Sequence, residues 1–540
     1  MDGDTTPVIC LRGTSVSPGL ARGPLIVIAD DTHSASRERG SAEEEAARMH
    51  AAIAAASVDL EALMERAGDD DAQTILAFQV AMLADPVVAE PAFAAIGRGD
   101  SAEDGWHAAM TLQIGQYHEA DDLYFRARAS DLRDMRDRVL RKLNGAAATP
   151  IAPGSIVVAA DLPPSRFLEI AWDGGGVALT HGSPNSHVAM LARARGVPML
   201  IGVENADLRG HTEAIIDTDN AILVLSPDHK LAVDFASRQQ GAEILRAEAA
   251  RYLNVAAATA NGERVRVLIN VADATELDAF DPACCDGIGL VRTELLLRDA
   301  NDIVSEERQY QLYCRILRWA DGRPVTMRTL DAGGDKAIAG YTIDGEANPF
   351  LGMRGLRLSL LHPDVFITQL RALARAALLG PLKIMVPMVT SPRELDRARA
   401  LLDGAVTALR KQGVACARPE LGMMVEVPAA ALAIDLFEAE FFSIGSNDLI
   451  QYVTASGRDS TPLAPLQDPL QPAVLRLIRE VVQRANAESI PVSLCGDMAS
   501  DVRCIPALLS VGLRCLSVPP SAVARVKAAI ARYRVNESKA

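Results

Sequence analysis

One histidine of this chain stands where its ring can do nucleophilic chemistry. His187 lies among small and apolar residues in the run 185–193 (NSHVAMLAR), just before a segment, 188–194, whose pattern predicts a helix. Backbone N–H groups at the start of a helix lack partners within it, and they favour an anion such as a phosphoryl group. An isolated Ser-His pair is more often part of an ordinary capping loop. The prediction that the protein phosphorylates His187 therefore depends on the rest of the chain.

The C-terminal half has the alternating pattern of a βα-repeat protein. From about Arg264 onward, short apolar segments alternate with helical patterns, and eight of these segments are predicted strands: 265–269, 287–291, 325–328, 383–388, 422–426, 441–444, 492–494 and 515–518. Eight βα units of this length predict a TIM barrel, with a doubly wound sheet as the alternative.

Polar side chains recur directly after these predicted strands. They are Arg292 after the second strand, Arg328 at the third, Glu426 at the fifth, Asn447 and Asp448 after the sixth, and Cys495 after the seventh. The carboxyl ends of the strands of a TIM barrel form one face, and that face holds the active site in such enzymes. Surface charges would instead scatter along the chain.

The chemical types in this set fit one kind of ligand. Arginine side chains bind carboxylate and phosphate through two parallel hydrogen bonds. Glu426 and Asp448 offer the hard oxygen ligands that Mg²⁺ prefers. Cys495 beside them can act as an acid. The set predicts a small, multiply anionic, metal-chelating substrate.

Composition limits the classes of protein to which the chain can belong. Its 540 residues suggest three or four domains, and 49% hydrophobic with 23% charged residues is typical of a soluble globular protein. An excess of 70 acidic over 54 basic residues argues against nucleic-acid binding. The chain has no apolar stretch of the length of a membrane span, no signal-peptide pattern, and eight cysteines without metal spacing. We therefore expect a cytoplasmic protein without membrane insertion.

The N-terminal half predicts two interleaved domains. Apolar runs at 8–11 and 25–28 predict strands, a long helical pattern follows, and strands resume at 155–159, 176–179, 198–201 and 221–224. The simplest arrangement is a helical bundle inserted into an α/β domain. The expected divisions are an α/β domain at 1–35 and 146–228, its helical insertion at 36–145, a helical linker at 229–254, and the barrel at 255–540.

Seven segments, in order along the chain, carry a resemblance to a known family. They are 186–193 (SHVAMLAR), 287–294 (GIGLVRTE), 328–336 (RTLDAGGDK), 348–357 (NPFLGMRGLR), 422–428 (GMMVEVP), 442–452 (FSIGSNDLIQY) and 494–497 (LCGD). With these segments the chain resembles Enzyme I of the bacterial sugar phosphotransferase system, the phosphoenolpyruvate–protein phosphotransferases. The matching segments span nearly its whole length.

The resemblance implies a role for each matching residue. It makes His187 the residue that takes a phosphoryl group on Nε2, and Cys495 the proton donor to the enolate carbon. It makes Glu426 and Asp448 the Mg²⁺ ligands. The positions that it implies for binding phosphoenolpyruvate are Arg292, Arg328, Arg354, Asn447, Asp448 and Arg458.

The resemblance also implies partners and a reaction. The α/β domain would swivel, its helical insertion would bind the phosphocarrier protein HPr, and the barrel would form a homodimer. The phosphoryl group of phosphoenolpyruvate would pass to His187 and then to a histidine of HPr, with release of pyruvate.

The chain departs from the family pattern at several positions. Residues 182–185 (GSPN), including Pro184 and Asn185, stand where the family commonly has a Gly-Gly pair and a Thr, which leaves the transfer rate and the choice of carrier open. Ala332, Met353 and Ser446 stand where Ile, Trp and Thr are usual. None of these changes removes a charged group.

Three alternatives compete with this interpretation. A pyruvate phosphate dikinase or phosphoenolpyruvate synthase needs a further nucleotide-binding domain, for which the region ahead of His187 is too short. The nitrogen-related phosphotransferase branch typically carries an N-terminal sensory domain, for which we expect no room before Val8. A non-catalytic regulator that senses phosphoenolpyruvate would be favoured by loss of His187 or Cys495, and both are present.

Overall fold

The computed structural model of the chain divides into two compact units, Met1–Gln240 and Gly241–Ala540. The division falls within the long helix α8 (His229–Ala250), where the sequence predicted a helix. The residues that the structure describes are 7–28, 39–66, 70–118, 123–145, 151–182, 186–278, 280–297, 299–334, 336–343, 345–457 and 461–534.

The first unit is built on an eight-stranded mixed sheet. Its strand order is β1-β8-β7-β3-β4-β5-β6-β2. The strands are β1 (Ile9–Arg12), β2 (Thr14–Ser17), β3 (Leu20–Ile28), β4 (Ile156–Ala159), β5 (Gly176–Leu179), β6 (Met199–Ile201), β7 (Glu213–Asp217) and β8 (Ile222–Leu225). The sequence predicted six of these, but it missed β2, β7 and the first half of β3.

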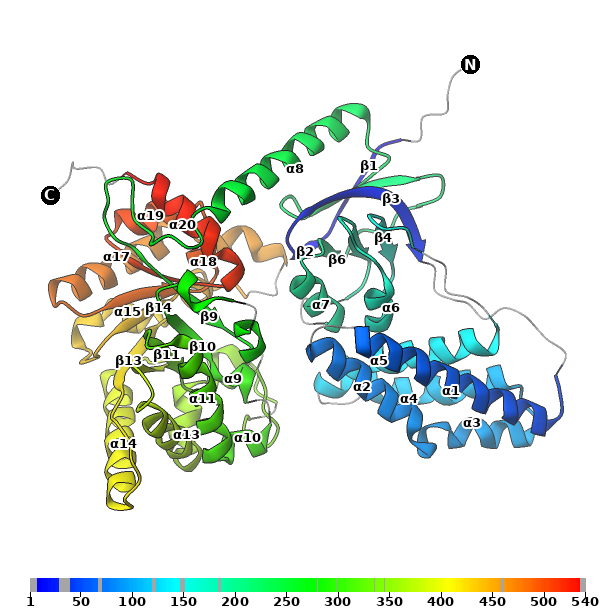
Figure 1. Cartoon of the computed structure of the whole chain (residues 1–540), viewed down its shortest axis with the longest axis horizontal. Helices are drawn as coiled ribbons and strands as arrows, with labels where there is room; N and C mark the ends of the chain where they lie inside the picture. Colours follow the sequence, from blue (N-terminus) through cyan, green and yellow to red (C-terminus); the bar gives the residue numbers. More distant parts are fainter. Residues whose placement is uncertain are drawn as a thin grey trace. The chain divides into compact units, whose positions relative to one another are not determined.

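The long strand β3 joins two parts of this sheet. Its first five residues, 20–24, pair antiparallel with β7, whereas 25–28 pair parallel with β4. The curvature of β3 is visible in Figure 1. From its end the chain enters five helices before it returns at β4. These are α1 (Ala42–Arg66), α2 (Asp70–Ala84), α3 (Pro86–Arg98), α4 (Ala102–His118) and α5 (Leu123–Leu143).

The breaks between these helices fall at the turn signals in the sequence. The Asp85 side chain caps α3 by accepting a hydrogen bond from the Val87 N–H, and Gly99 ends it in the left-handed conformation with φ +116°. The short helices α6 (Pro164–Glu169) and α7 (His187–Arg195) lie between the sheet and the five helices (Figure 1). One continuous apolar core includes residues from all three layers.

The second unit is a closed barrel of eight parallel strands, which confirms the predicted TIM barrel. Its strand order is β9 to β16, and β16 pairs with β9 to close it. The strands are β9 (Arg266–Val271), β10 (Ile288–Arg292), β11 (Val325–Arg328), β12 (Leu382–Val386), β13 (Glu420–Val425), β14 (Phe442–Gly445), β15 (Val492–Cys495) and β16 (Cys515–Val518). Each overlaps one of the eight predicted strands, with ends shifted by at most two residues.

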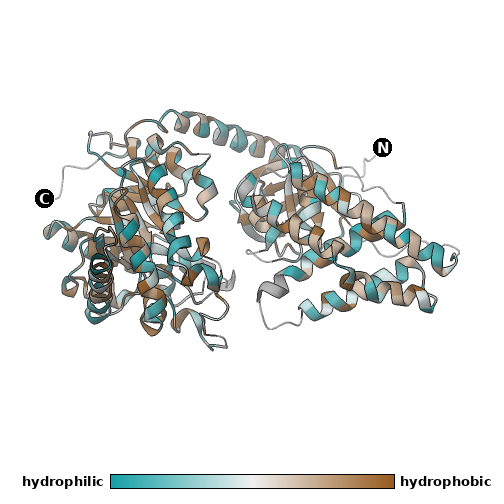
Figure 2. Ribbon diagram, turned by 60° about the horizontal axis from the view of Figure 1, so that its bottom comes forward, coloured by the Kyte–Doolittle hydropathy of each residue, from teal (hydrophilic) through white to brown (hydrophobic). Residues whose placement is uncertain are grey.

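Helices surround this barrel, and the longer ones among them bury an apolar face against it. They are α9 (Thr293–Leu296), α10 (Ala300–Val304), α11 (Glu306–Ala320), α12 (Leu356–Leu361), α13 (Pro363–Ala376), α14 (Pro392–Lys411), α15 (Pro428–Leu432), α16 (Ser446–Thr454), α17 (Pro472–Ala487), α18 (Asp497–Ser500), α19 (Ile505–Ser510) and α20 (Val523–Arg532). The strands are largely hydrophobic and the long outer helices carry alternating hydrophilic and hydrophobic stretches (Figure 2). A main core lies between strands and helices, and a small cluster that includes Met385, Met424 and Cys495 fills the barrel interior.

Among the described residues, no single helix is both long and apolar enough to cross a membrane. The bent pair Ile75–Ala84 and Pro86–Arg98 satisfies the length and composition limits only when the two helices are taken together.

Candidate functional site

His187 is the first residue of α7, in agreement with its predicted place at a helix N-terminus. The preceding Ser186 caps the helix, because its hydroxyl accepts a hydrogen bond from the Ala189 N–H at 3.3 Å. Gly196 ends the helix in the left-handed conformation. The His187 side chain is 16% exposed, and its Nδ1 lies 3.2 Å from Oδ1 of Asp131 on α5. Residues 183–185, which include Pro184 and Asn185, lie outside the described residues.

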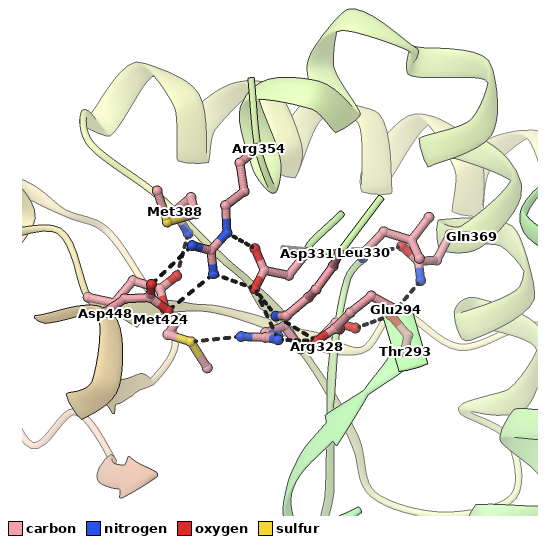
Figure 3. A network of polar contacts seen from close by, with 12 residues as sticks. Thr293, Glu294, Arg328, Leu330, Asp331, Arg354, Gln369, Met388, Met424 and Asp448 are labelled. Atoms are coloured by element: carbon pink, nitrogen blue, oxygen red, sulfur yellow. Dashed lines mark hydrogen bonds and ion pairs between the residues drawn. The ribbon is translucent and has the colours of Figure 1, made fainter. Parts of the chain in front are cut away.

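At the carboxyl ends of the barrel strands, the structure brings Arg328, Arg354 and Asp448 together in one buried network of charged side chains (Figure 3). Arg328, the last residue of β11, donates to Glu294 and lies 3.1 Å from Oδ2 of Asp331. The Lys336 ammonium binds the same two carboxylates, at 3.0 Å from Glu294 and 2.8 Å from Asp331. Arg328 is therefore oriented by two carboxylates at its Nη2 and by the Met424 sulfur, 3.5 Å from its Nη1.

Arg354 joins this network to the next part of the site. Its guanidinium donates two hydrogen bonds of 3.0 Å to the Asp331 carboxylate, and two more, of 3.0 and 3.2 Å, to the Asp448 carboxylate. Figure 3 shows the guanidinium between the two acids. Arg354 is buried, so each of these two-point pairs is protected from water.

A layer of neutral side chains holds the ends of β10 and β11 in place beneath the charges. Gln369 on α13 accepts from the Leu330 N–H at 3.1 Å and donates to the Thr293 hydroxyl at 3.2 Å. Thr293 in turn donates to the Arg328 carbonyl at 2.7 Å. These bonds fix the backbone that positions the two predicted arginines.

Glu426 directly follows β13. Its side chain is buried, and only one of its two carboxyl oxygens has a hydrogen-bond partner among the described residues. Its Oε1 accepts a hydrogen bond from the Met388 N–H at 2.6 Å, whereas Oε2 has no hydrogen-bond partner among the described residues. Burial raises the pKa of Glu426 to about 8, and the nearby Asp448 and Asp331 carboxylates add to the rise. The site therefore has room for one more positive charge at this carboxyl group.

The balance of charge explains why Glu426 differs from its neighbours. Three cations, Arg328, Lys336 and Arg354, face four carboxyl groups: Glu294, Asp331, Asp448 and Glu426. Burial acts to raise the pKa of Asp331, but Arg328, Lys336 and Arg354 outweigh it and hold that pKa far below its usual range. Glu294 is likewise held low, since Arg328 and Lys336 outweigh its burial. Glu426 is the carboxyl group left without a matching cation, and its raised pKa means that it holds a proton at neutral pH until a further cation binds.

Cys495 ends β15 inside the barrel, next to the charged network. The thiol donates to the Ile444 carbonyl at 3.6 Å and accepts from the Ser443 hydroxyl at 3.7 Å. Burial raises the pKa of the Cys495 thiol, while Ser443, Arg328 and Arg292 act in the opposite direction. The group therefore stays a protonated thiol, as a proton donor must.

Side-chain hydrogen bonds tie the segment of Ser446 and Asn447 to the segment that contains Cys495 and Asp497. The Asn447 side chain donates to Asp497 at 3.1 Å and accepts from the Asp497 N–H at 2.9 Å. Ser446 donates to the Cys495 carbonyl at 2.9 Å. Between these groups lies Gly496, at φ +95°, where an added Cβ would stand 2.3 Å from Ser446 Oγ and 2.6 Å from Asn447 Oδ1.

Two predicted arginines differ from the rest. Arg292 ends β10, and in the part of the chain that the structure describes its side chain makes no hydrogen bond or ion pair, although it is near enough to Cys495 to affect the thiol. Its guanidinium is therefore available to a ligand. Arg458 lies outside the described residues, so its predicted role is left to experiment.

Sequence reasoning missed three members of the network. Glu294, Asp331 and Lys336 received no role, although they stand in the quoted segments 287–294 and 328–336. The signal was available, because Glu294 and Asp331 follow the strand-end residues Arg292 and Arg328 by two and three positions. A buried arginine at a strand end needs a carboxylate partner close by.

The donor set at Glu426 and Asp448 fits Mg²⁺. Among the described residues, no group of three or more His, Cys, Asp or Glu side chains could hold a metal ion. Mg²⁺, however, is usually held by one or two carboxylates together with substrate oxygens and water. The unpartnered Oε2 of Glu426 is a ligand atom of the required kind.

Comparison with protein families covers most of the chain. Residues 246–535 match the PEP-binding domain of PEP-utilising enzymes, 12–128 match the N-terminal domain, and 151–221 match the mobile domain. The phosphoenolpyruvate-protein phosphotransferase of Geobacillus stearothermophilus is 35% identical, with 98% of this chain and 94% of that protein covered. This chain belongs to the phosphoenolpyruvate–protein phosphotransferase family.

A second member of this family matches the chain with similar identity and coverage. The phosphoenolpyruvate-protein phosphotransferase of Cupriavidus necator is 34% identical, with 96% of this chain and 93% of that protein covered. A solution structure described as Enzyme I (nEIt) covers 43% of this chain and 99% of its own, at 24% identity and a TM-score of 0.38. The matches to the family domains and to the two phosphoenolpyruvate-protein phosphotransferases confirm the expected resemblance at the level of the family.

Gly496→Ala tests how tightly the backbone at Cys495 is packed. The required conformation alone costs a residue with a side chain roughly 1–3 kcal/mol, and the contacts with Ser446 and Asn447 add to this. We expect a lower unfolding midpoint of the barrel in urea, monitored by circular dichroism. Gly404→Ala, in the interior of α14 with no atom within 4 Å of an added Cβ, should instead be neutral or stabilising by up to about 1 kcal/mol. Equal midpoints for the two variants would contradict the packing argument.

Proposed function

We propose that this chain transfers the phosphoryl group of phosphoenolpyruvate to His187 and then to a histidine of the phosphocarrier protein HPr. Pyruvate is released, and the reaction is the first step of the bacterial sugar phosphotransferase system, in the cytoplasm. The observation that carries the proposal is that arginines, the carboxyl groups of Glu426 and Asp448, and the protonated Cys495 thiol lie close enough at the barrel end to act on one another. The family of the chain agrees with this chemistry.

The substrate would lie against the arginines of the barrel. Arg292 is free to bind a carboxylate or phosphate through two hydrogen bonds, and Arg328 is already oriented by Glu294 and Asp331. Asn447, Arg354, the Asp448 backbone and Arg458 complete the proposed binding set. Glu426 and Asp448 would hold Mg²⁺, which when bound neutralises and orients the oxygens of the transferred phosphoryl group.

The side chains supply the remaining steps of the reaction. The Nε2 lone pair of His187 attacks phosphorus while the bond from phosphorus to the enol oxygen breaks. The electron pair of that bond leaves with the enolate, and the Cys495 thiol gives a proton to the enolate carbon, so that pyruvate forms. The thiol is protonated for this purpose because burial raises its pKa. Positioning and charge stabilisation carry most of the catalysis in phosphoryl transfer.

Partner binding is proposed for both units. The helices α1–α5 would bind HPr, and support comes from the exposed apolar side chains Val87 and Leu112 on α3 and α4. The barrel would form the homodimer, and support comes from the exposed Leu432 and Leu436. A nitrogen-related carrier, or a regulatory role without catalysis, remains the alternative. Pyruvate release on addition of phosphoenolpyruvate, Mg²⁺ and HPr separates catalysis from regulation, and replacing HPr by its nitrogen-related counterpart separates the branches.

His187→Ala tests the phosphorylated residue. We expect no acid-labile label after incubation with ³²P-labelled phosphoenolpyruvate, because His187 combines the capped start of α7 with a ring nitrogen 3.2 Å from the buried Asp131 carboxylate. His181→Ala, six residues earlier, is the matched control and should label normally. Substantial label retained in His187→Ala would mean that another residue carries the phosphoryl group.

Glu426→Gln tests the metal site separately from turnover. The amide keeps the hydrogen bond from the Met388 N–H but lacks the charge that a cation needs. In a His187→Ala background, where phosphoenolpyruvate is not consumed, titration calorimetry should show Mg²⁺ binding weakened by at least about 10-fold. Glu440→Gln, an exposed residue just before β14, should bind Mg²⁺ as the parent does. Unchanged affinity in Glu426→Gln would exclude Glu426 as a ligand.

Arg292→Lys tests the substrate clamp. The charge is kept but the two-point geometry is lost, so kcat/KM for phosphoenolpyruvate should fall by at least about 10-fold, a loss of about 1.4 kcal/mol. Arg308→Lys on the outer helix α11, where the arginine pairs with Asp302, is the control and should retain normal kinetics. Near-normal turnover in Arg292→Lys would show that this position does not clamp the substrate.

A further inference from the structure

A buried carboxylate on the helical insertion contacts the ring of His187. Asp131 on α5 is fully buried, and its Oδ1 lies 3.2 Å from His187 Nδ1. The two residues are 56 positions apart in the chain. The contact therefore joins the five-helix insertion directly to the nucleophile proposed above.

The second oxygen of the same carboxylate is held by an arginine. Arg128, one turn earlier on α5, donates to Asp131 Oδ2 at 3.0 Å. Its guanidinium also lies 4.4 Å from the centre of the Phe78 ring on α2, in a cation–π contact. The carboxylate is thus fixed between a permanent cation on one side and the imidazole on the other.

This arrangement decides which ring nitrogen carries the proton. A carboxylate paired with a guanidinium is only an acceptor, so the nitrogen that faces it must be the donor. In a neutral imidazole one nitrogen is a donor and the other an acceptor. With hydrogen on Nδ1, the lone pair is on Nε2.

We propose that Asp131 is a positioning residue for phosphoryl transfer, which holds His187 in the Nδ1–H form and leaves Nε2 free to attack phosphorus. The inference rests on the proposed function of His187. When the Nε2–P bond forms and the P–O bond to the enolate breaks, the ring keeps its Nδ1 proton and acquires a positive charge. The negative Asp131 carboxylate stabilises that positive charge while His187 is phosphorylated. When the phosphoryl group leaves for the carrier, the ring becomes neutral again and keeps its Nδ1 proton.

A neighbouring carboxylate on the same helix provides the comparison for a purely structural role. Asp134, also buried, accepts from Gln79 at 3.0 Å and from the backbone N–H and hydroxyl of Ser165, at 3.1 and 2.8 Å. It ties α5 to α2 and α6 and has no contact with His187 in the described structure. Replacing this carboxyl group by an amide should perturb packing without altering the imidazole.

The substitution Asp131→Asn has an expected effect that a structural role does not produce. Arg128 can only donate, so it should take the amide oxygen and turn the amide NH₂ toward His187. An NH₂ facing Nδ1 favours the opposite tautomer, with hydrogen on Nε2, and so blocks the nucleophile. The near-isosteric Asp131→Asn should therefore be slower than Asp131→Ala, in which the ring is free to adopt either form.

The test combines ring NMR with single-turnover kinetics on the full chain. In protein labelled with ¹⁵N-histidine, with His187 assigned by comparison with His187→Gln, the wild-type ring should carry its proton on Nδ1 and Asp131→Asn should shift it to Nε2. Phosphorylation by ³²P-phosphoenolpyruvate should slow by roughly 10- to 100-fold in Asp131→Asn, with KM nearly unchanged. Asp134→Asn should keep the wild-type tautomer and a rate within roughly twofold of wild type.

Three results would overturn the inference: a wild-type ring protonated on Nε2, an Asp131→Asn ring with the wild-type tautomer, or equal slowing in Asp131→Asn and Asp134→Asn. The first needs only the wild-type protein and the His187→Gln protein used for the assignment, so it does not depend on folding of the Asp131 and Asp134 variants. Failure of the proposed function is distinguishable, because wild-type protein would then carry no label on His187 while the ring measurement still reports the contact with Asp131.

Discussion

The barrel site depends on one constraint: the charges of its buried side chains must be neutralised by other side chains, because water does not reach them. A buried ion is tolerated only where opposite charges and hydrogen bonds surround it. Arg328 and Arg354 meet this condition through Asp331, which binds both guanidinium groups. Because Asp331 binds both Arg328 and Arg354, the two guanidinium groups are oriented before a ligand binds. Ligand binding therefore does not have to restrict their motion. Among the described carboxyl groups of this network, Glu426 has a raised pKa, and its unpartnered Oε2 is where an added cation gains most.

The fold was largely predictable because each barrel strand is an apolar run separated from the next by a helical pattern. Buried parallel strands carry apolar residues on both faces, which makes them easy to recognise. The missed strands in the first unit lack that signal. β2 reads Thr-Ser-Val-Ser, and β7 begins and ends with the charged residues Glu213 and Asp217. Gly23 and Pro24 within β3 read as a turn, although this segment continues as a strand against β7.

The positions of strand ends and the family resemblance predicted the residues that we propose to face a ligand. They did not predict Glu294, Asp331 and Lys336, the charged residues that hold the arginines in place. The strand-end rule finds residues that face a ligand, but it does not find those that pair with them from other segments. On α5 the charges of Arg128, Asp131 and Asp134 resemble those of a solvated helix face, yet all three side chains are buried. Only the three-dimensional packing of α5 against α2, α6 and α7 distinguishes a solvated face of charged residues from a buried one.

The pairing of β1 with β8 has a consequence for synthesis on the ribosome. Ile9 lies opposite Leu225, so the sheet of the first unit cannot be completed until more than two hundred residues have been translated. The helices α1–α5 are formed from one continuous stretch and pack mainly on one another, so their contacts become available much earlier. On the ribosome, the contacts among these helices are therefore complete in sequence before the N-terminal strands have their partners, while the core that the helices share with α6, α7 and the sheet still waits for later residues.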